Sequence, residues 1–202
     1  MKEIVKNIIF YLFPALIIRK GKSGAVYITF DDGPHSDNTL KILDILKNSG
    51  MKATFFMVGS EMDKYPDRVQ AVINEGHAIG YHSYAHESLK KMSLSESIQD
   101  FNKAKKIEQK FGIKFRCYRP PYGDLTVMGV IMAILRRWKI VMWSLDSEDS
   151  FHGREEVMNI VHPDKISDGE ILLFHDDYDL TVDILPGILG QMSCRDIYSK
   201  AL

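Results

Sequence analysis

Short apolar runs rich in β-branched and aromatic residues alternate with segments of helical periodicity along most of the chain. This alternation constrains the fold more than any other feature, because it is the pattern of repeated strand–helix units. The predicted strands cover residues 25–30, 53–58, 77–82, 115–119, 140–145 and 171–175, and the predicted helices cover residues 38–48, 66–74, 93–110, 125–138 and 182–192. Two helix ends carry specific signals: Ser93-Leu94-Ser95-Glu96 has the spacing of a capping box, and Asn48-Ser49-Gly50 suits a helix C-terminus.

These repeated units predict an α/β fold with a mainly parallel sheet of about six or seven strands. The periodicity does not distinguish an open doubly wound sheet from a barrel. In both architectures ligands bind at the C-terminal ends of the strands. Functional side chains are therefore expected just after the predicted strands.

The composition is that of a single globular domain. A chain of 202 residues with 45% hydrophobic and 26% charged residues can bury a substantial core. The 26 basic and 27 acidic residues give a net charge of −1, so no overall field favours nucleic acid. We expect no nucleic-acid partner, and nothing in the sequence indicates the oligomeric state.

The N-terminal segment, residues 1–22, is interpreted separately from residues 23–202. Lys2 and Lys6 precede an apolar stretch, residues 8–18, and Arg19-Lys20-Gly21-Lys22 follows it. A secretory signal would end in a small-residue cleavage site, and Arg19-Lys20-Gly21-Lys22 is not one. A spanning helix needs about 20 apolar residues, whereas this stretch is shorter and contains Pro14.

Three interpretations of this segment remain: a stretch packed on the domain, a helix lying in a membrane interface, and an uncleaved anchor. We favour the first two together, with peripheral membrane contact through residues 4–18. The expected location is the cytoplasm or the inner membrane surface, and an exported or anchored form stays open.

Ionisable side chains follow five of the predicted strands at their C-terminal ends. They are Asp31 and Asp32, His82 with His86, Arg119, Asp146 with Asp149, and His175 with Asp176. Parallel strands place these ends on one face of the domain, so the side chains are expected to lie together. Unrelated surface residues would be scattered.

Asp31, Asp32, His82 and His86 have the chemistry of a metal site. Adjacent residues at a strand end point in different directions, so one carboxylate can bind a metal while the other faces water. A cation also relieves the repulsion between two close carboxylates. Two histidines and one carboxylate leave positions open for water and substrate. Each pattern alone has an ordinary alternative, because Asp-Asp-Gly-Pro also forms turns and an isolated pair of histidines four residues apart is often incidental.

Two further segments could supply catalytic groups. Arg119-Pro120-Pro121-Tyr122-Gly123 is a stiff turn that can hold a backbone N–H toward a developing oxyanion, or it is a plain loop. His175 leaves a buried strand, where it can act as a general acid or be an ordinary core or surface histidine.

In this order, the motifs resemble those of the polysaccharide deacetylase family, also called carbohydrate esterase family four. The resemblance runs over about residues 27–189, and four ordered motifs together are specific although each alone is not. The matching segments are Thr29-Phe30-Asp31-Asp32-Gly33-Pro34 for the first motif, His82-Ser83-Tyr84-Ala85-His86 for HSxxH, Arg119-Pro120-Pro121-Tyr122-Gly123 for RxPYG, and Leu173-Phe174-His175 for LxH.

The resemblance implies a distorted (β/α)7-type barrel with mainly parallel strands, in which residues 23–202 are the catalytic domain. It also implies a divalent metal, with Zn²⁺ as the expected ion, bound by Asp32, His82 and His86. The resemblance further implies that Asp31 is the general base, held in place by Arg119, and that His175 is the general acid, oriented by Asp149. The backbone N–H of Tyr122 would bind the oxyanion. The implied substrate-binding residues are Pro121, Tyr122 and Leu173.

One motif departs from the family pattern. The family's Asp-x-x-Asp-Trp motif corresponds to Asp146-Ser147-Glu148-Asp149-Ser150, which keeps both acids and lacks the tryptophan. We therefore expect the substrate groove to miss an aromatic wall at Ser150, with an effect on substrate preference.

The activity implied by the resemblance is hydrolysis of an N-acetyl group from an amino sugar of a polysaccharide, oligosaccharide or glycolipid, by water activated at the metal. Two alternatives stay open. One is a deformylase or deacylase of a lipid-linked amino sugar, and the other is a catalytically silent carbohydrate-binding module on the same fold. Binding alone would require neither Asp31 nor His175.

Overall fold

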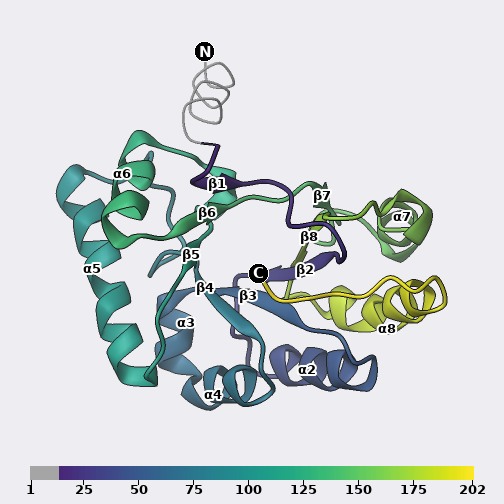
Figure 1. Ribbon diagram of the computed structural model, residues 1–202. Coiled ribbons are helices and arrows are strands. Elements are labelled where there is room, and N and C mark those ends of the chain that lie inside the picture. Colours follow the sequence, from purple (N-terminus) through teal and green to yellow (C-terminus); the bar gives the residue numbers. More distant parts are fainter. Residues whose placement is uncertain (1–13) are drawn as a thin grey trace.

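A curled sheet of eight parallel strands forms the centre of the protein, and helices surround it on the outside (Figure 1). The structure is a computed structural model that describes residues 14–202. The strands are β1 (Ile17–Ile18), β2 (Tyr27–Asp31), β3 (Ala53–Met57), β4 (Ala78–Tyr81), β5 (Cys117–Tyr118), β6 (Lys139–Val141), β7 (Leu145–Asp146) and β8 (Ile171–His175). Their order in the sheet is β1-β6-β5-β4-β3-β2-β8-β7, and every pair is parallel.

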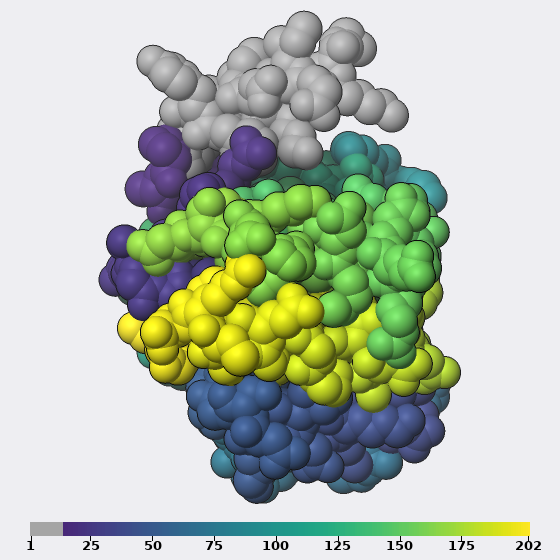
Figure 2. All heavy atoms as spheres, turned by 90° about the vertical axis from the view of Figure 1, so that its right-hand side faces the viewer, coloured from purple at the N-terminus to yellow at the C-terminus, as the bar shows by residue number. Residues whose placement is uncertain are grey.

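The helices follow the strands along the chain, as the alternating pattern predicts. They are α2 (Asn38–Asn48), α3 (Gly59–Lys64), α4 (Pro66–Asn74), α5 (Leu94–Phe111), α6 (Val127–Arg136), α7 (Arg154–Ile160) and α8 (Asp179–Ser193), with short 3-10 turns η1 (Pro121–Gly123) and η2 (Pro163–Lys165). Helix α8 packs against both α2 and α7, and Figure 2 shows this C-terminal part of the chain, in yellow and yellow-green, between the blue and green segments.

The central strands are buried on both sides. All five residues of β2 and all five of β3 are buried, as expected for parallel strands covered by helices. Aromatic rings join neighbouring strands, because the Phe30 ring centroid lies 5.0 Å from that of Phe55 and 5.9 Å from that of Phe174. This core fixes β2, β3 and β8, so the residues at their C-terminal ends have a rigid base.

The prediction of one strand over residues 140–145 is wrong. The segment is split into β6 and β7, which lie near opposite edges of the sheet. Four Cα–Cα steps join Val141 to Leu145 and span at most about 14 Å, so the two edges must approach each other. The chain thus changes strand partners, from β1 and β5 to β8, and this crossing brings the curled sheet toward closure as a distorted barrel.

Most other predicted elements are confirmed. Helices α2 and α4 have the predicted bounds, and α5 begins with the predicted capping box at Ser93 and Glu96. The sequence interpretation missed β1, β7, α3 and α7, which have two, two, six and seven residues. Such short elements do not complete enough turns or alternations to give a periodic signal.

The N-terminal segment is described only from Pro14 onward. Within it, β1 pairs with β6 and Ile17 is buried, so residues 17–18 belong to the sheet. The predicted membrane contact through residues 4–18 falls largely on residues 1–13, which lie outside the described part, and the boundary at residue 22 stays a prediction. Between residues 14 and 202, no helix is long and apolar enough to cross a bilayer.

We predict that Ser93→Ala lowers the free energy of unfolding by about 1 kcal/mol, because α5 loses its capping box. In the structure the Ser93 hydroxyl accepts from the Glu96 N–H at 3.3 Å, and the Glu96 carboxylate accepts from the Ser93 N–H at 2.7 Å. Urea unfolding followed by circular dichroism measures the change. Ser95→Ala, on an exposed position in the same turn, is the matched control, and an equal loss in both variants would contradict the assignment.

Candidate active site

We call the C-terminal ends of the strands the rim. Arg119 is a fully buried cation just below this rim. Its Nη1 donates to Asp31 Oδ1 at 2.6 Å and to Thr29 Oγ1 at 2.8 Å. Its Nε and Nη2 donate to the carbonyls of Val141 and Met142, both at 3.2 Å. A buried charge is tolerated only when it is paired and hydrogen-bonded. The carboxylate of Asp31 is therefore held in one orientation, with Oδ1 taken by the guanidinium.

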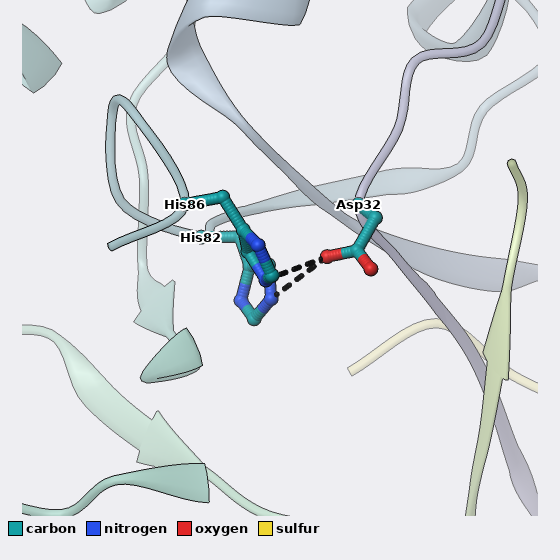
Figure 3. Close-up of side chains that lie close together, drawn as sticks. All are labelled: Asp32, His82 and His86. Atoms are coloured by element: carbon teal, nitrogen blue, oxygen red, sulfur yellow. Dashed lines mark ion pairs between the residues drawn. The ribbon is translucent and has the colours of Figure 1, made fainter. Parts of the chain in front are cut away.

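The side chains of Asp32, His82 and His86 point toward one another (Figure 3). Asp31 lies beside this cluster, with Oδ2 3.7 Å from His82 Nε2. Asp32 Oδ1 lies 3.3 Å from His82 Nε2 and 2.9 Å from His86 Nε2, and one ligand atom from each residue lies within 4.8 Å of the others. Burial raises the pKa of Asp32, but the two histidines outweigh it and hold this pKa well below its ordinary value. Two imidazole nitrogens and one carboxylate are a donor set for a divalent transition metal.

Two observations test whether this cluster fits a metal ion. The His82 ring lies with Nδ1 2.8 Å from the Arg119 carbonyl, so an Nδ1–H donating there leaves the Nε2 lone pair facing Asp32. Asp32 Oδ1 is buried, and within the described part of the chain no group meets it with hydrogen-bond geometry, including the two imidazole Nε2 atoms 2.9 and 3.3 Å away. A cation between these three groups would satisfy the orphaned oxygen, so the residues fit the metal that the resemblance implies.

Backbone strain is concentrated at the same place. Of the seven non-glycine residues with positive φ in residues 14–202, four lie at the site: Asp32 (74°), Ser83 (66°), His86 (53°) and Tyr122 (59°). Such conformations cost free energy and persist where the surroundings impose them, which is frequent at functional sites. At Tyr122 the strain accompanies the sharp η1 turn, whose last residue, Gly123, also has a positive φ.

His175 and Asp149 form a second buried pair across the rim. His175 Nδ1 lies 2.7 Å from Asp149 Oδ1, and the other carboxylate oxygen accepts from the His175 N–H at 2.8 Å and from the Thr181 hydroxyl at 2.6 Å. Burial lowers the pKa of His175, but Asp149 and, more weakly, Asp31 and Asp32 outweigh this and raise the pKa to about 9. The ring is thus held as an imidazolium at neutral pH, and Nε2 has no hydrogen-bond partner among residues 14–202.

These groups surround one cavity of about 460 Å³. It is lined by Asp31, Asp32, His82, His86, Tyr122, Gly123, Trp143, Asp146, Ser150, Phe151, Leu173, His175 and Tyr178. Seven of the residues predicted for the site therefore face one space. Arg119 and Asp149 lie behind Asp31 and His175, and Pro121 is buried at the start of η1 rather than in the cavity lining.

Three aromatic residues of the cavity were missed by the sequence interpretation: Trp143, Phe151 and Tyr178. Phe151 is 83% exposed and adjoins Ser150, so the loss of the motif tryptophan does not leave the groove without an aromatic side chain there. Trp143 falls in the link between β6 and β7, which the sequence interpretation assigned to a strand. Trp143 lines the cavity from this link, where the chain changes strand partners.

A second hollow of about 360 Å³ adjoins the first and shares Asp32 and His86 with it. Its lining includes Glu61 and Asp177, which the sequence interpretation did not single out. Burial raises the pKa of Asp177, and so does the nearby Asp32. The Asp32–His82–His86 cluster thus lies between two hollows, and a long ligand could extend to both sides of it.

Comparisons with known proteins agree with this geometry. A family model described as polysaccharide deacetylase matches residues 18–137. A peptidoglycan-N-acetylglucosamine deacetylase of Bacillus cereus is 40% identical over 125 residues, covering 61% of this chain and 46% of that protein. Another from the same species is 34% identical over 173 residues, covering 83% of this chain and 81% of that protein. The PgdA deacetylase of Listeria monocytogenes is 33% identical over 84% of this chain but only 36% of its own length. The chain therefore spans less than half the length of some of its relatives.

Solved structures show the same fold. The Bc1960 peptidoglycan N-acetylglucosamine deacetylase, in complex with 4-naphthalen-1-yl-N-oxidanyl-benzamide, is 30% identical with a TM-score of 0.87, covering 96% of this chain and 94% of that one. The protein BA3943 of Bacillus anthracis, described as a pseudoenzyme, is 24% identical with a TM-score of 0.84, covering 92% of this chain and 67% of that one, and shows the fold alone. Motifs, barrel and relatives point to one conclusion: this chain belongs to the polysaccharide deacetylase family.

Proposed function

We propose that this chain is an enzyme that hydrolyses the N-acetyl amide of an amino sugar in a peptidoglycan-type polysaccharide, with a divalent metal at Asp32, His82 and His86. One observation carries the proposal. A buried carboxylate held by Arg119 and an imidazolium held by Asp149 line the same cavity as the three ligand groups. A carbohydrate-binding module would need neither proton-transfer group.

Zn²⁺ is the metal that the donor set favours, because two imidazoles and a carboxylate leave coordination positions open. When bound, it would act as a Lewis acid on the amide carbonyl and on water. The protein contributes the orientation of its ligands. The His82 ring is fixed by the Arg119 carbonyl, and the strained backbone at Asp32 and His86 turns both side chains toward one point.

Asp31 is the proposed general base. It is 4% exposed, and Arg119 occupies Oδ1, so Oδ2 is the oxygen available to accept a proton from an attacking water. Asp31 Oδ2 lies 3.7 Å from His82 Nε2 and so faces the cluster where that water would be activated.

His175 is the proposed general acid. Its imidazolium can donate the Nε2 proton to the amine nitrogen as the C–N bond breaks, which yields acetate and a free amino sugar. Asp149 fixes the ring through Nδ1, and Thr181 holds Asp149 in turn. The backbone N–H of Tyr122 is the proposed donor to the tetrahedral oxyanion, and the strained turn at η1 would hold it in place.

The substrate class follows from the shape and the relatives. A cluster between two hollows suits a chain of sugars better than a single one, and the aromatic side chains in the cavity offer faces on which sugar rings can lie. The relatives named as peptidoglycan-N-acetylglucosamine and N-acetylmuramic acid deacetylases support a peptidoglycan substrate, whereas a chitooligosaccharide deacetylase of Azorhizobium caulinodans, 35% identical, keeps chitin fragments in the test.

We expect the zinc-loaded chain to release acetate from peptidoglycan fragments in an assay that also includes chitooligosaccharides and lipid-linked N-acetylhexosamines. The variant Asp31→Asn should lower kcat by about 10²–10⁴-fold, because it removes the general base, while zinc binding by calorimetry is kept. Release of formate from an N-formylated analogue, with no acetate release from the N-acetylated substrates, would replace the proposal by the deformylase. Tight zinc binding with no release from any substrate would favour the silent module.

The pH profile of kcat/KM should have an alkaline limb governed by His175, since the acid is lost as the pH rises through its pKa of about 9. The variant Asp149→Asn removes the negative charge of a group that raises the pKa of His175, so the alkaline limb should move to lower pH. In His175→Gln the limb should be absent from the residual rate. An alkaline limb at the same pH in all three proteins would exclude His175 as the titrating acid.

Zinc should raise the melting temperature of the protein, because a ligand that binds only the folded state stabilises it. The variant His86→Ala should lose most of this rise, while His152→Ala should keep it, because His152 lies outside the cluster and contacts Glu148 and Glu156. Differential scanning fluorimetry with and without a chelator measures the effect. An equal rise in wild type and His86→Ala would place the ion elsewhere.

A further inference from the structure

Helix α6 exposes an apolar stripe to solvent. The stripe follows i, i+4, i+7, i+8 spacing, so its members lie on one face of the helix while the opposite face packs into the core. Its residues and their exposed fractions are Val127 (62%), Ile131 (44%), Ile134 (48%) and Leu135 (72%). Single exposed apolar residues are ordinary, but a contiguous group of them marks an interaction surface.

The neighbouring helix α5 also exposes large apolar residues. Helix α5 packs against α6 and contributes Leu94 and Ile98, which are 61% and 39% exposed. Within the described part of the chain, six of the eleven exposed large hydrophobic residues lie on these two helices. Three others line or adjoin the active-site cavity, so the α5–α6 face is a separate apolar surface.

The C-terminal end of α6 is basic. Arg136 and Arg137 end the helix, Lys139 opens β6, and the sequence has no Asp or Glu between residues 125 and 145. Lys139 Nζ donates to the carbonyl of Ala15, so the first described residues of the chain lie at this basic end. An apolar stripe that ends in cations is the pattern of a helix that lies in a membrane interface and is attracted to anionic lipids.

The chain before the described region joins the domain at the same end. Strand β1 pairs with β6, directly after α6 in the sequence. Residues 8–13 are Ile-Ile-Phe-Tyr-Leu-Phe, with Lys2 and Lys6 before them. The sequence before Pro14 is therefore apolar and basic as well.

We propose that the α5–α6 face, namely the apolar stripe with its basic end at Arg136, Arg137 and Lys139, docks onto the surface of an anionic lipid bilayer. In a two-fold contact between copies of this chain the same face would meet itself, and α6 carries no acidic residue to pair with these cations. Anionic headgroups supply that partner, and the acyl boundary takes up the apolar side chains. Docking through this face lies outside the deacetylase chemistry and needs none of its residues.

Sedimentation of the full chain with vesicles tests the proposal. We expect more binding to phosphatidylcholine vesicles that contain phosphatidylglycerol than to vesicles of phosphatidylcholine alone. The neutral double variant Ile131→Gln/Leu135→Gln should lower the partition coefficient by about ten-fold. The variant Arg137→Gln should weaken binding to the anionic vesicles alone. Leu40→Gln, at an exposed apolar position on α2, is the matched control and should bind as the wild type does.

The fold of each variant is checked by thermal melting and by acetate release from a soluble substrate, which should equal the wild type. Two results would overturn the proposal. The first is that the double variant binds vesicles as the wild type does, while a chain without residues 1–13 no longer binds. This result would assign all anchoring to that segment. The other is no vesicle binding by the full chain, with a dimer in light scattering that the double variant converts to monomer.

Discussion

The buried guanidinium of Arg119 is the interaction on which the site depends. From the end of β5 it reaches Thr29 and Asp31 on β2, and the carbonyls of Val141 and Met142 where the chain leaves β6. One side chain thus connects three parts of the barrel just below the rim. A buried ion pair of this kind gives little net stability, but removal of one partner is expensive, of the order of 3–5 kcal/mol. Its value lies in fixing the position of Asp31.

Around this pair the rim separates two kinds of chemistry. On one side, strained backbone at Asp32 and His86 directs a carboxylate and two imidazoles to one point, where a cation fits. On the other side, the Asp149 carboxylate keeps His175 protonated. An acid and a base can coexist in one cavity because each has its own buried counter-charge. This separation, more than the barrel, favours a hydrolase, since the same fold is also found in a protein described as a pseudoenzyme.

The surface adds a second level of organisation. The active-site cavity and the α5–α6 face are the two places where large apolar side chains gather at the surface of the described region. The first combines them with acids and histidines, as suits a polar sugar. The second combines them with cations and no acids along α6, as suits a lipid interface. Both follow from side-chain chemistry placed on the same strand–helix units.

The sequence alone determined the parallel strand–helix plan and the capping box of α5, because both depend on local periodicity and spacing. It also determined which ionisable residues follow the five strands that end at the rim. Tertiary structure decided the rest. The closing of the sheet depends on a change of strand partners after Val141, which no local pattern encodes, and Trp143 lines the cavity from this link. Residues 125–138 are apolar on nearly every side, so only packing decided which face of α6 entered the core and which stayed exposed.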